Sequence, residues 1–195
     1  MKTNFKKLFV FILTCISVVP SVNFKAAAIP AESDESSEIV NINSAQDWID
    51  ISNRIEQSMR YTEGKYFSLN NDIVLDAPDV QHHTEWSDLY GTLNGNNHTI
   101  TVNGRWMGCL ITSIYQGGRI TNVKFSNFSD VIGHNWGQID NCEFTNPNAP
   151  NNTFVCENKN PGIILNCRYS GNAIALRNKG TITNCQMIQQ NPQHN

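Results

Sequence analysis

The sequence predicts an all-β fold, a single-stranded right-handed parallel β-helix of about five coils with one N-terminal capping α-helix. Three observations support this prediction. A glycine-led pattern recurs four times in the second half of the chain, each copy has an asparagine at the same place, and an amphipathic segment of helical period precedes the repeats. A repeat of this kind indicates one domain built by stacking similar coils.

The N-terminus has the features of a secretory signal peptide. Three lysines lie among the first seven residues, residues 8–22 form an apolar run, and Ala26-Ala27-Ala28 supplies the small residues of a cleavage site. The apolar run is shorter than the roughly 20 residues that cross a bilayer. We therefore expect residues 1–28 to be removed after Ala28, and the mature chain to be secreted and extracellular without a membrane anchor.

The mature chain is acidic and lacks clustered cations. Removal of the four lysines in residues 1–28 leaves 10 basic and 17 acidic residues, a net charge of −7. A nucleic-acid-binding surface carries a stripe of Lys and Arg, which neither half of this chain has. We therefore expect no nucleic-acid partner and, after cleavage of the signal, no membrane partner.

Residues 29–43 form an acidic, serine-rich leader, and a helix is expected to follow it. Ser44 is a suitable N-cap, and Asp47 stands three residues later, as in a capping box. The apolar residues that then recur at helical spacing are Trp48, Ile51, Ile55 and Met59. This stripe predicts one amphipathic helix that caps the coils.

Residues 44–90 are expected to hold this helix, the first strands and an irregular loop. Strands are indicated where apolar residues alternate with other residues, at Phe67, Leu69, Ile73 and Leu75. Residues 76–90 show no such period and are predicted to be the loop.

Residues 91–195 are predicted to form the coils, because a pattern G-x-I-x-N-[C/V]-x-[F/Y/M] recurs there. Its copies begin at Gly118, Gly137, Gly162 and Gly180, which are 19, 25 and 18 residues apart. The longest step contains a proline-broken insertion at residues 146–152. A period near 20 residues is too short for paired helices and suits one turn of a solenoid of short strands.

The pattern also predicts how each coil bends. The apolar residues on both sides of the asparagine can face inward together only if the chain turns there, and asparagine tolerates the left-handed conformation that such a turn needs. Equivalent residues of successive coils should then stack as structural ladders. The predicted ladders are Asn122, Asn141, Asn166 and Asn184, and, as small buried hydrophobes, Cys142, Cys167 and Cys185.

Two further segments resemble a known family. Gly91-Thr-Leu-Asn-Gly-Asn-Asn-His-Thr-Ile100 and Tyr66-Phe-Ser-Leu-Asn-Asn-Asp-Ile73 are similar to the strands that precede the coils in exported bacterial right-handed parallel β-helix proteins, the pectate-lyase-like solenoids. The resemblance covers about residues 44–188 and implies the fold. It does not imply one function, since this solenoid carries lyases, hydrolases, adhesins and inert wall proteins.

The coils offer few acids for catalysis. Glycoside hydrolysis needs two carboxyls near one bond, whereas Asp140 and Glu143 lie on opposite sides of an asparagine corner. Glu143 shares its outward register with Lys124 and Arg168, which predicts a structural charge ladder. The sequence therefore indicates no catalytic residue. The acids available in the coils are Asp130, Asp140, Glu143 and Glu157.

No metal site or cofactor is expected. The spacing of the acids and histidines in the loop matches no metal-binding signature. Five cysteines remain after cleavage, an odd number without a CxxC pair, which argues against both a zinc site and a complete disulfide framework. The crowded loop residues are His82, His83, Glu85 and Asp88.

Aromatic residues outside the inward register are the candidate binding residues. They could stack on sugars or contact a protein, or they could pack into the corners and under the loops. These candidates are Trp106, Tyr115, Phe128 and Trp136.

The sequence thus favours a secreted, non-enzymatic module that contacts a glycan or a protein partner at or outside the cell surface. Two alternatives stay open: a carbohydrate-active enzyme (polysaccharide lyase or glycoside hydrolase) or a fragment of one, and a purely structural or assembly unit. We also expect the C-terminal coil to associate end to end with a second copy or to dock a partner, unless the tail after Met187 folds back over it.

Overall fold

The computed structural model describes residues 37–76, 85–104, 108–146 and 152–188. In these residues one helix accompanies three sheets whose strands are all parallel. Sheet I contains, in order, β1 (Glu38–Ile42), β2 (Lys65–Leu69), β5 (Thr92–Asn94), β8 (Arg119–Thr121), β11 (Gln138–Asp140), β14 (Ile163–Leu165) and β17 (Thr181–Thr183). Sheet II contains β3 (Ile73–Asp76), β6 (Thr99–Asn103), β9 (Lys124–Ser126), β12 (Glu143–Thr145), β15 (Arg168–Tyr169) and β18 (Gln186–Met187). Sheet III contains β4 (Trp86–Leu89), β7 (Cys109–Ile114), β10 (Asp130–Asn135), β13 (Thr153–Asn158) and β16 (Ala173–Asn178).

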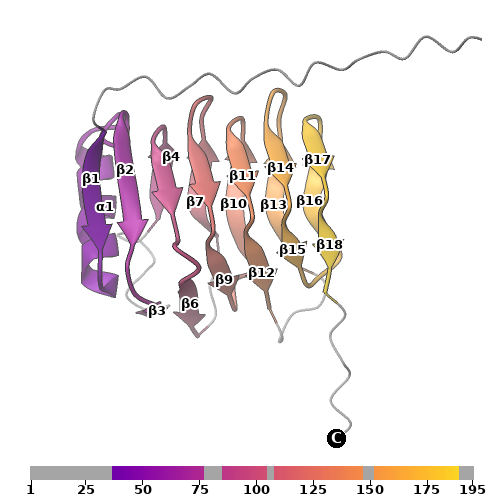
Figure 1. The fold of residues 1–195 in the computed structure, drawn as a ribbon, viewed down its shortest axis with the longest axis horizontal. Coiled ribbons are helices and arrows are strands. Elements are labelled where there is room, and N and C mark those ends of the chain that lie inside the picture. Colours follow the sequence, from indigo (N-terminus) through magenta and orange to yellow (C-terminus); the bar gives the residue numbers. More distant parts are fainter. Residues whose placement is uncertain (1–36, 77–84, 105–107, 147–151, 189–195) are drawn as a thin grey trace, which may run out of the picture. The chain divides into compact units, whose positions relative to one another are not determined.

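From β2 onward the chain visits the three sheets in turn, so each coil contributes one strand to each sheet. Figure 1 shows the strands of successive coils lying side by side in sequence order. The prediction of a mostly parallel β-fold with a single helix is confirmed, and the arrangement is consistent with a parallel solenoid.

Helix α1 (Ala45–Gln57) begins where the capping signal predicts. The Ser44 hydroxyl accepts a hydrogen bond from the Asp47 N–H, and the Asp47 carboxylate accepts one from the Asn43 N–H. The helix packs against β1, β3 and β4, with Trp48 stacked on Trp86 at 4.1 Å between ring centroids. The apolar stripe is one turn shorter than expected, because the helix ends at Gln57 and Met59 is exposed.

Two expected irregular segments contain strands. β1 lies inside the predicted leader, where pairing with β2 buries Ile42. β4 lies inside the predicted loop of residues 76–90, where Trp86 and Leu89 are fully buried in the core. The G-x-I-x-N pattern covers strands of sheets I and II alone, so the third strand of each coil was not anticipated.

The corners between sheets I and II are built by a column of asparagines. Asn122, Asn141, Asn166 and Asn184 have φ values of 55°, 50°, 54° and 52°, the left-handed conformation. The Asn141 side-chain amide donates to Oδ1 of the Asn122 side chain at 2.7 Å, and the Asn184 side-chain amide donates to Oδ1 of Asn166 at 3.3 Å. Asn166 donates instead to the Asp140 carboxylate at 3.0 Å. Each corner is therefore bound to the coil before it.

The glycines that open the coils lie against one another. A Cβ atom on Gly137 would collide with the backbone oxygen of Gly118, and one on Gly180 would collide with that of Gly162. A side chain at these positions would push neighbouring coils apart, which explains why the repeated pattern starts with glycine.

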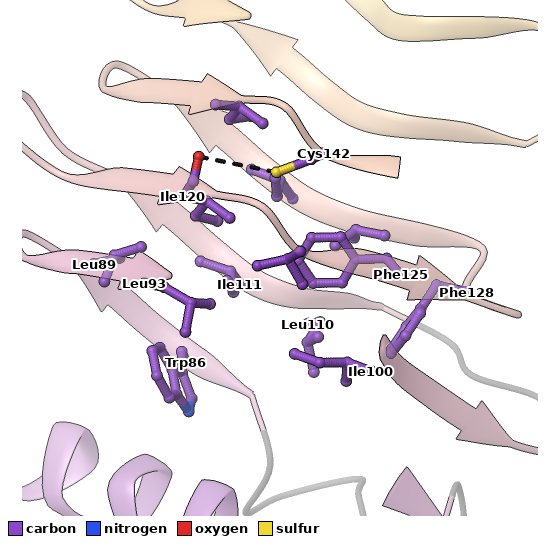
Figure 2. Packing of buried hydrophobic residues seen from close by; sticks show 14 of the residues in the cluster. Trp86, Leu89, Leu93, Ile100, Leu110, Ile111, Ile120, Phe125, Phe128 and Cys142 are labelled. Carbon is purple, nitrogen blue, oxygen red and sulfur yellow. Dashed lines mark hydrogen bonds between the residues drawn. The ribbon is translucent and has the colours of Figure 1, made fainter. Parts of the chain in front are cut away.

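The interior is filled by stacked equivalent side chains. Ile120, Ile139 and Ile164 are fully buried, and the Phe125 and Phe144 rings stack at 5.3 Å. Figure 2 shows this packing, including the weak contact between the Cys142 thiol and the Ile120 carbonyl oxygen.

The cysteines of the ladder differ in burial. All five described cysteines are free thiols, and Cys142 and Cys167 are buried between coils. Cys185 is partly exposed, since it belongs to the last described coil, so its expected burial is wrong. The pKa of the Cys167 thiol is raised, mainly by its contact with the Cys142 thiol and also by its burial.

We predict that Asn141→Ala lowers the free energy of unfolding by about 1–3 kcal/mol, because alanine loses the side-chain hydrogen bond and is strained at positive φ. Asn141→Gly should lose less, since glycine tolerates this φ and sacrifices only the hydrogen bond. Gln186→Ala, at an exposed position of β18, is the control. Urea unfolding measures all three, and equal midpoints for Asn141→Ala and Gln186→Ala would contradict the corner model.

We also predict that Cys142 and Cys167 react slowly with a thiol reagent in the native protein and quickly after denaturation. Burial excludes the reagent, and the raised pKa of Cys167 reduces its thiolate fraction. Cys185 should react faster and serves as an internal control. Mass spectrometry of labelled peptides over time measures the rates, and rapid native labelling of Cys142 would disprove its burial.

Candidate functional site

A row of polar residues crosses sheet III at one register position. Parallel pairing places Asp88 beside Ser113, Ser113 beside His134, His134 beside Glu157 and Glu157 beside Arg177. Neighbouring strands are about 4.8 Å apart, so these side chains lie within reach of one another. We call Asp88, Ser113, His134, Glu157 and Arg177 the polar row.

Glu157 is the centre of the charges in this row. Its carboxylate lies 3.3 Å from His134 Nδ1, 3.3 Å from an Arg177 nitrogen and in contact with Lys159 Nζ. Its side chain is only 12% exposed. The pKa of Glu157 is lowered, mainly by the Lys159 ammonium and further by Arg177 and His134. Burial opposes this shift in part. The carboxylate therefore stays charged at neutral pH and holds two cations, Lys159 and Arg177, together beside the His134 ring.

Four side chains form a stack along the corner where sheet III leads into sheet I. Tyr90 and Tyr115 stack at 4.4 Å between centroids, Tyr115 and Trp136 at 5.6 Å, and Lys159 Nζ lies 5.8 Å from the Trp136 ring centre. Arg60 covers Tyr90 at 5.6 Å. We call Tyr90, Tyr115, Trp136 and Lys159 the corner stack.

The corner stack presents ring edges rather than ring faces. Each ring face is covered by the next member or by a cation, so a sugar cannot lie flat on these rings without displacing a neighbour. The three side chains are partly exposed, so solvent reaches part of each ring.

The corner stack and the polar row meet at Tyr115. Burial, followed by the charge of Asp88, raises the pKa of the Tyr115 phenol, and the phenol also interacts with Ser113. The phenol therefore stays protonated at neutral pH, so it can donate or accept a hydrogen bond. The two groups are therefore contiguous and make one surface, in which Asp88, Ser113 and Glu157 are largely covered, at 6%, 7% and 9% exposed.

The sequence located this surface in part. Tyr115 and Trp136 belong to it, whereas Trp106 lies outside the described residues. Phe128 is not a binding residue of this surface, because it is fully buried and packs edge-on against Phe125 at 6.3 Å.

Tyr90 and the polar row were missed. A signal for Tyr90 exists in the sequence, because Tyr90-Gly91 and Trp136-Gly137 both place an aromatic residue directly before a coil-opening glycine. Sequence spacing also gives His134 no acid at the same place in the repeated pattern, yet Glu157 pairs with it in register. That pairing depends on the third strand of the coil.

Most carboxylates of the coils neutralise cations. Asp140 binds Arg119 at 2.9 Å, and Glu143 binds Arg168 at 3.1 Å in the predicted register with Lys124. In the described part of the chain, no hydrogen bond joins Ser113 to His134, the contact that a serine nucleophile and its base would need.

The described residues contain neither a cluster of metal ligands nor a helix that could cross a membrane. Among them, no group of three or more His, Cys, Asp or Glu residues is placed to hold a metal ion, and His82 and His83 fall outside them. No helix in residues 37–76, 85–104, 108–146 or 152–188 is long and apolar enough to cross a membrane.

Comparisons of the chain with protein-family models, with curated proteins and with solved structures found no match.

We predict that Glu157 makes stability depend on acid. Its folded pKa is lowered below the usual value of about 4.3, so its stabilisation is complete above that pH and is lost as the pH falls through the folded pKa. The difference in Tm between wild type and Glu157→Gln should therefore be large at neutral pH and shrink below about pH 4. The same change at exposed Glu63 should alter Tm little at any pH. Thermal melts from pH 3 to pH 7 measure this, and a constant difference would contradict the ion-pair role.

Proposed function

We propose that this chain is a secreted, non-enzymatic right-handed β-helix module that contacts an extended glycan at or outside the cell surface. The observation that carries the proposal is the corner stack, which repeats an aromatic side chain from coil to coil and lies beside the polar row.

The right-handed assignment follows from general chirality. A connection between parallel strands of one sheet is right-handed in about 98% of cases, because twisted strands pack back onto the sheet only that way. Three features support a β-helix: the chain enters three parallel sheets in turn, asparagines form the corners, and glycines open the coils.

A linear polymer matches a linear row. Tyr90, Tyr115 and Trp136 offer polar ring edges at intervals of about one strand spacing, 4.8 Å, and Lys159 extends the series with an ammonium group. A glycan chain lying along the coils would meet a hydrogen-bonding group at each step. Many weak contacts of this type give reversible binding whose strength grows with ligand length.

The ion pairs of the coils support a binding role more than a catalytic one. Asp140, Glu143 and Glu157 each hold at least one cation, whereas a glycosidase needs two carboxyls that flank one bond. A glycan would instead be held by the hydroxyl, indole and ammonium groups of the corner stack, without a change in its bonds.

Association through the last coil remains part of the proposal. Leu176 and Met187 are 64% and 55% exposed, while α1 covers the first coils. Two copies that associate would therefore meet through their last coils, where Leu176 and Met187 are exposed.

We predict that a glycan array probed with the purified protein retains one class of linear glycan. Tyr115→Phe, which removes only the hydroxyl at the ring edge, should weaken that binding about fivefold, the equivalent of about 1 kcal/mol. Tyr66→Phe makes the same chemical change on sheet I and should leave binding unchanged. Trp136→Ala should remove most of the binding.

Two outcomes of this experiment would contradict the proposal. In the first, the array retains no glycan, and the chain instead binds a protein partner in a way that depends on Tyr115 and Trp136. The second is equal weakening by Tyr115→Phe and Tyr66→Phe, which would place the ligand elsewhere.

A further inference from the structure

Two thiols that are far apart in the sequence meet on sheet III. Cys109 begins β7 and Cys156 lies in β13, 47 residues later, yet their sulfur atoms are 4.0 Å apart. Both side chains are partly exposed, unlike Cys142 and Cys167 in the core. A small ion can therefore reach this pair from solvent.

The space between the thiols exists because the intervening strand carries glycine. Gly133 of β10 lies opposite Cys156, since the flanking pairs join Ile132 to Val155 and His134 to Glu157. A Cβ atom on Gly133 would lie 3.5 Å from the Cys109 sulfur and 2.6 Å from the Thr112 carbonyl oxygen. A side chain at this position would clash with the Thr112 backbone and press against the Cys109 sulfur.

A direct disulfide does not fit this position. β7 and β13 each pair with β10, so they are separated by two strand spacings, about 9.6 Å. The Cα atoms of a disulfide are usually about 4.4–6.8 Å apart. Closing the bond would need backbone movement against the hydrogen bonds of the sheet, so the two thiols stay near each other without joining.

We propose that Cys109 and Cys156 bind one soft monovalent cation, Cu(I), as a two-coordinate bis-thiolate site. With a bond length similar to the roughly 2.3 Å of zinc–thiolate bonds, two sulfurs on one ion are about 4.6 Å apart when the sulfur–metal–sulfur angle is linear and about 4.0 Å apart when it is near 120°. The observed 4.0 Å falls in this range. On binding, two S–H bonds break, two metal–sulfur bonds form and two protons pass to solvent, with no change in oxidation state.

The surroundings select the type of ion. Zinc sites take four ligands, and in the described residues no third His, Cys, Asp or Glu joins this pair. Thiolates select Cu(I), which accepts two of them. The carboxyl of Asp130, paired in register with Cys109, acts electrostatically on both thiols. Glu85 acts on Cys109, while Glu157 and the cation Arg177 act on Cys156, so three carboxyls face one guanidinium around the pair.

The test is an anaerobic titration of the reduced protein with Cu(I) in competition with bicinchoninate. Wild type should retain one Cu(I) per chain, and Cys109→Ser and Cys156→Ser should each lose it. Cys185→Ser makes the same change at another partly exposed cysteine and should keep it. Bound Cu(I) should also protect Cys109 and Cys156, but not Cys185, from alkylation in the wild-type chain.

X-ray absorption of the loaded wild type should show two sulfur neighbours. Three results would each overturn the proposal. The wild type could retain no Cu(I), Cys185→Ser could lose Cu(I) to the same extent as Cys109→Ser, or Cu(I) could bind without protecting Cys109 from alkylation. A wild-type mass two hydrogens lighter, with a peptide joining Cys109 to Cys156, would show a disulfide instead. If a serine variant fails to fold, the alkylation pattern of wild type decides alone.

Discussion

The constraint on which the structure depends is that every coil must bend in the same way at the same place. Parallel strands can pair in register along three sheets only if each corner repeats the geometry of the one before. Asn141 satisfies this requirement twice, because its backbone adopts positive φ and its side chain donates to Asn122. Its backbone N–H also donates to Leu165 of the next coil at 3.1 Å. One residue type therefore turns the chain and joins three coils.

Register then turns a repeated sequence into continuous rows of like groups. Inside, isoleucines and phenylalanines stack, and Phe144 is packed between Phe125 and Phe154. Outside, the same rule brings together residues whose types do not repeat, such as Ser113, His134 and Glu157. A solenoid thus gains its core from similarity between coils, whereas its surface chemistry comes from the differences between them.

The proposed glycan surface and the proposed metal site use sheet III in different ways. The corner stack depends on side chains that follow the strands and cover one another, which leaves their edges to a ligand. The thiol pair depends on a missing side chain, since Gly133 opens the space between two strands that do not pair directly. Each proposal can fail without the other, because the two surfaces share no residue.

The sequence by itself determined the capping helix, the corners and the inward positions of sheets I and II, since these features repeat with a fixed pattern or carry a local signal such as Ser44 and Asp47. It also identified Tyr115 and Trp136 as exceptions to the inward register. Only the tertiary structure decided the third strand of each coil, because that strand has no repeated pattern and is defined by pairing between coils. The contact of His134 with Glu157 and the approach of Cys109 to Cys156 follow from that pairing, whereas Phe128 is buried against Phe125 of sheet II. Contacts across coils join residues about 20 to 47 positions apart in the sequence. The conformational preferences of neighbouring residues do not specify contacts at such a separation.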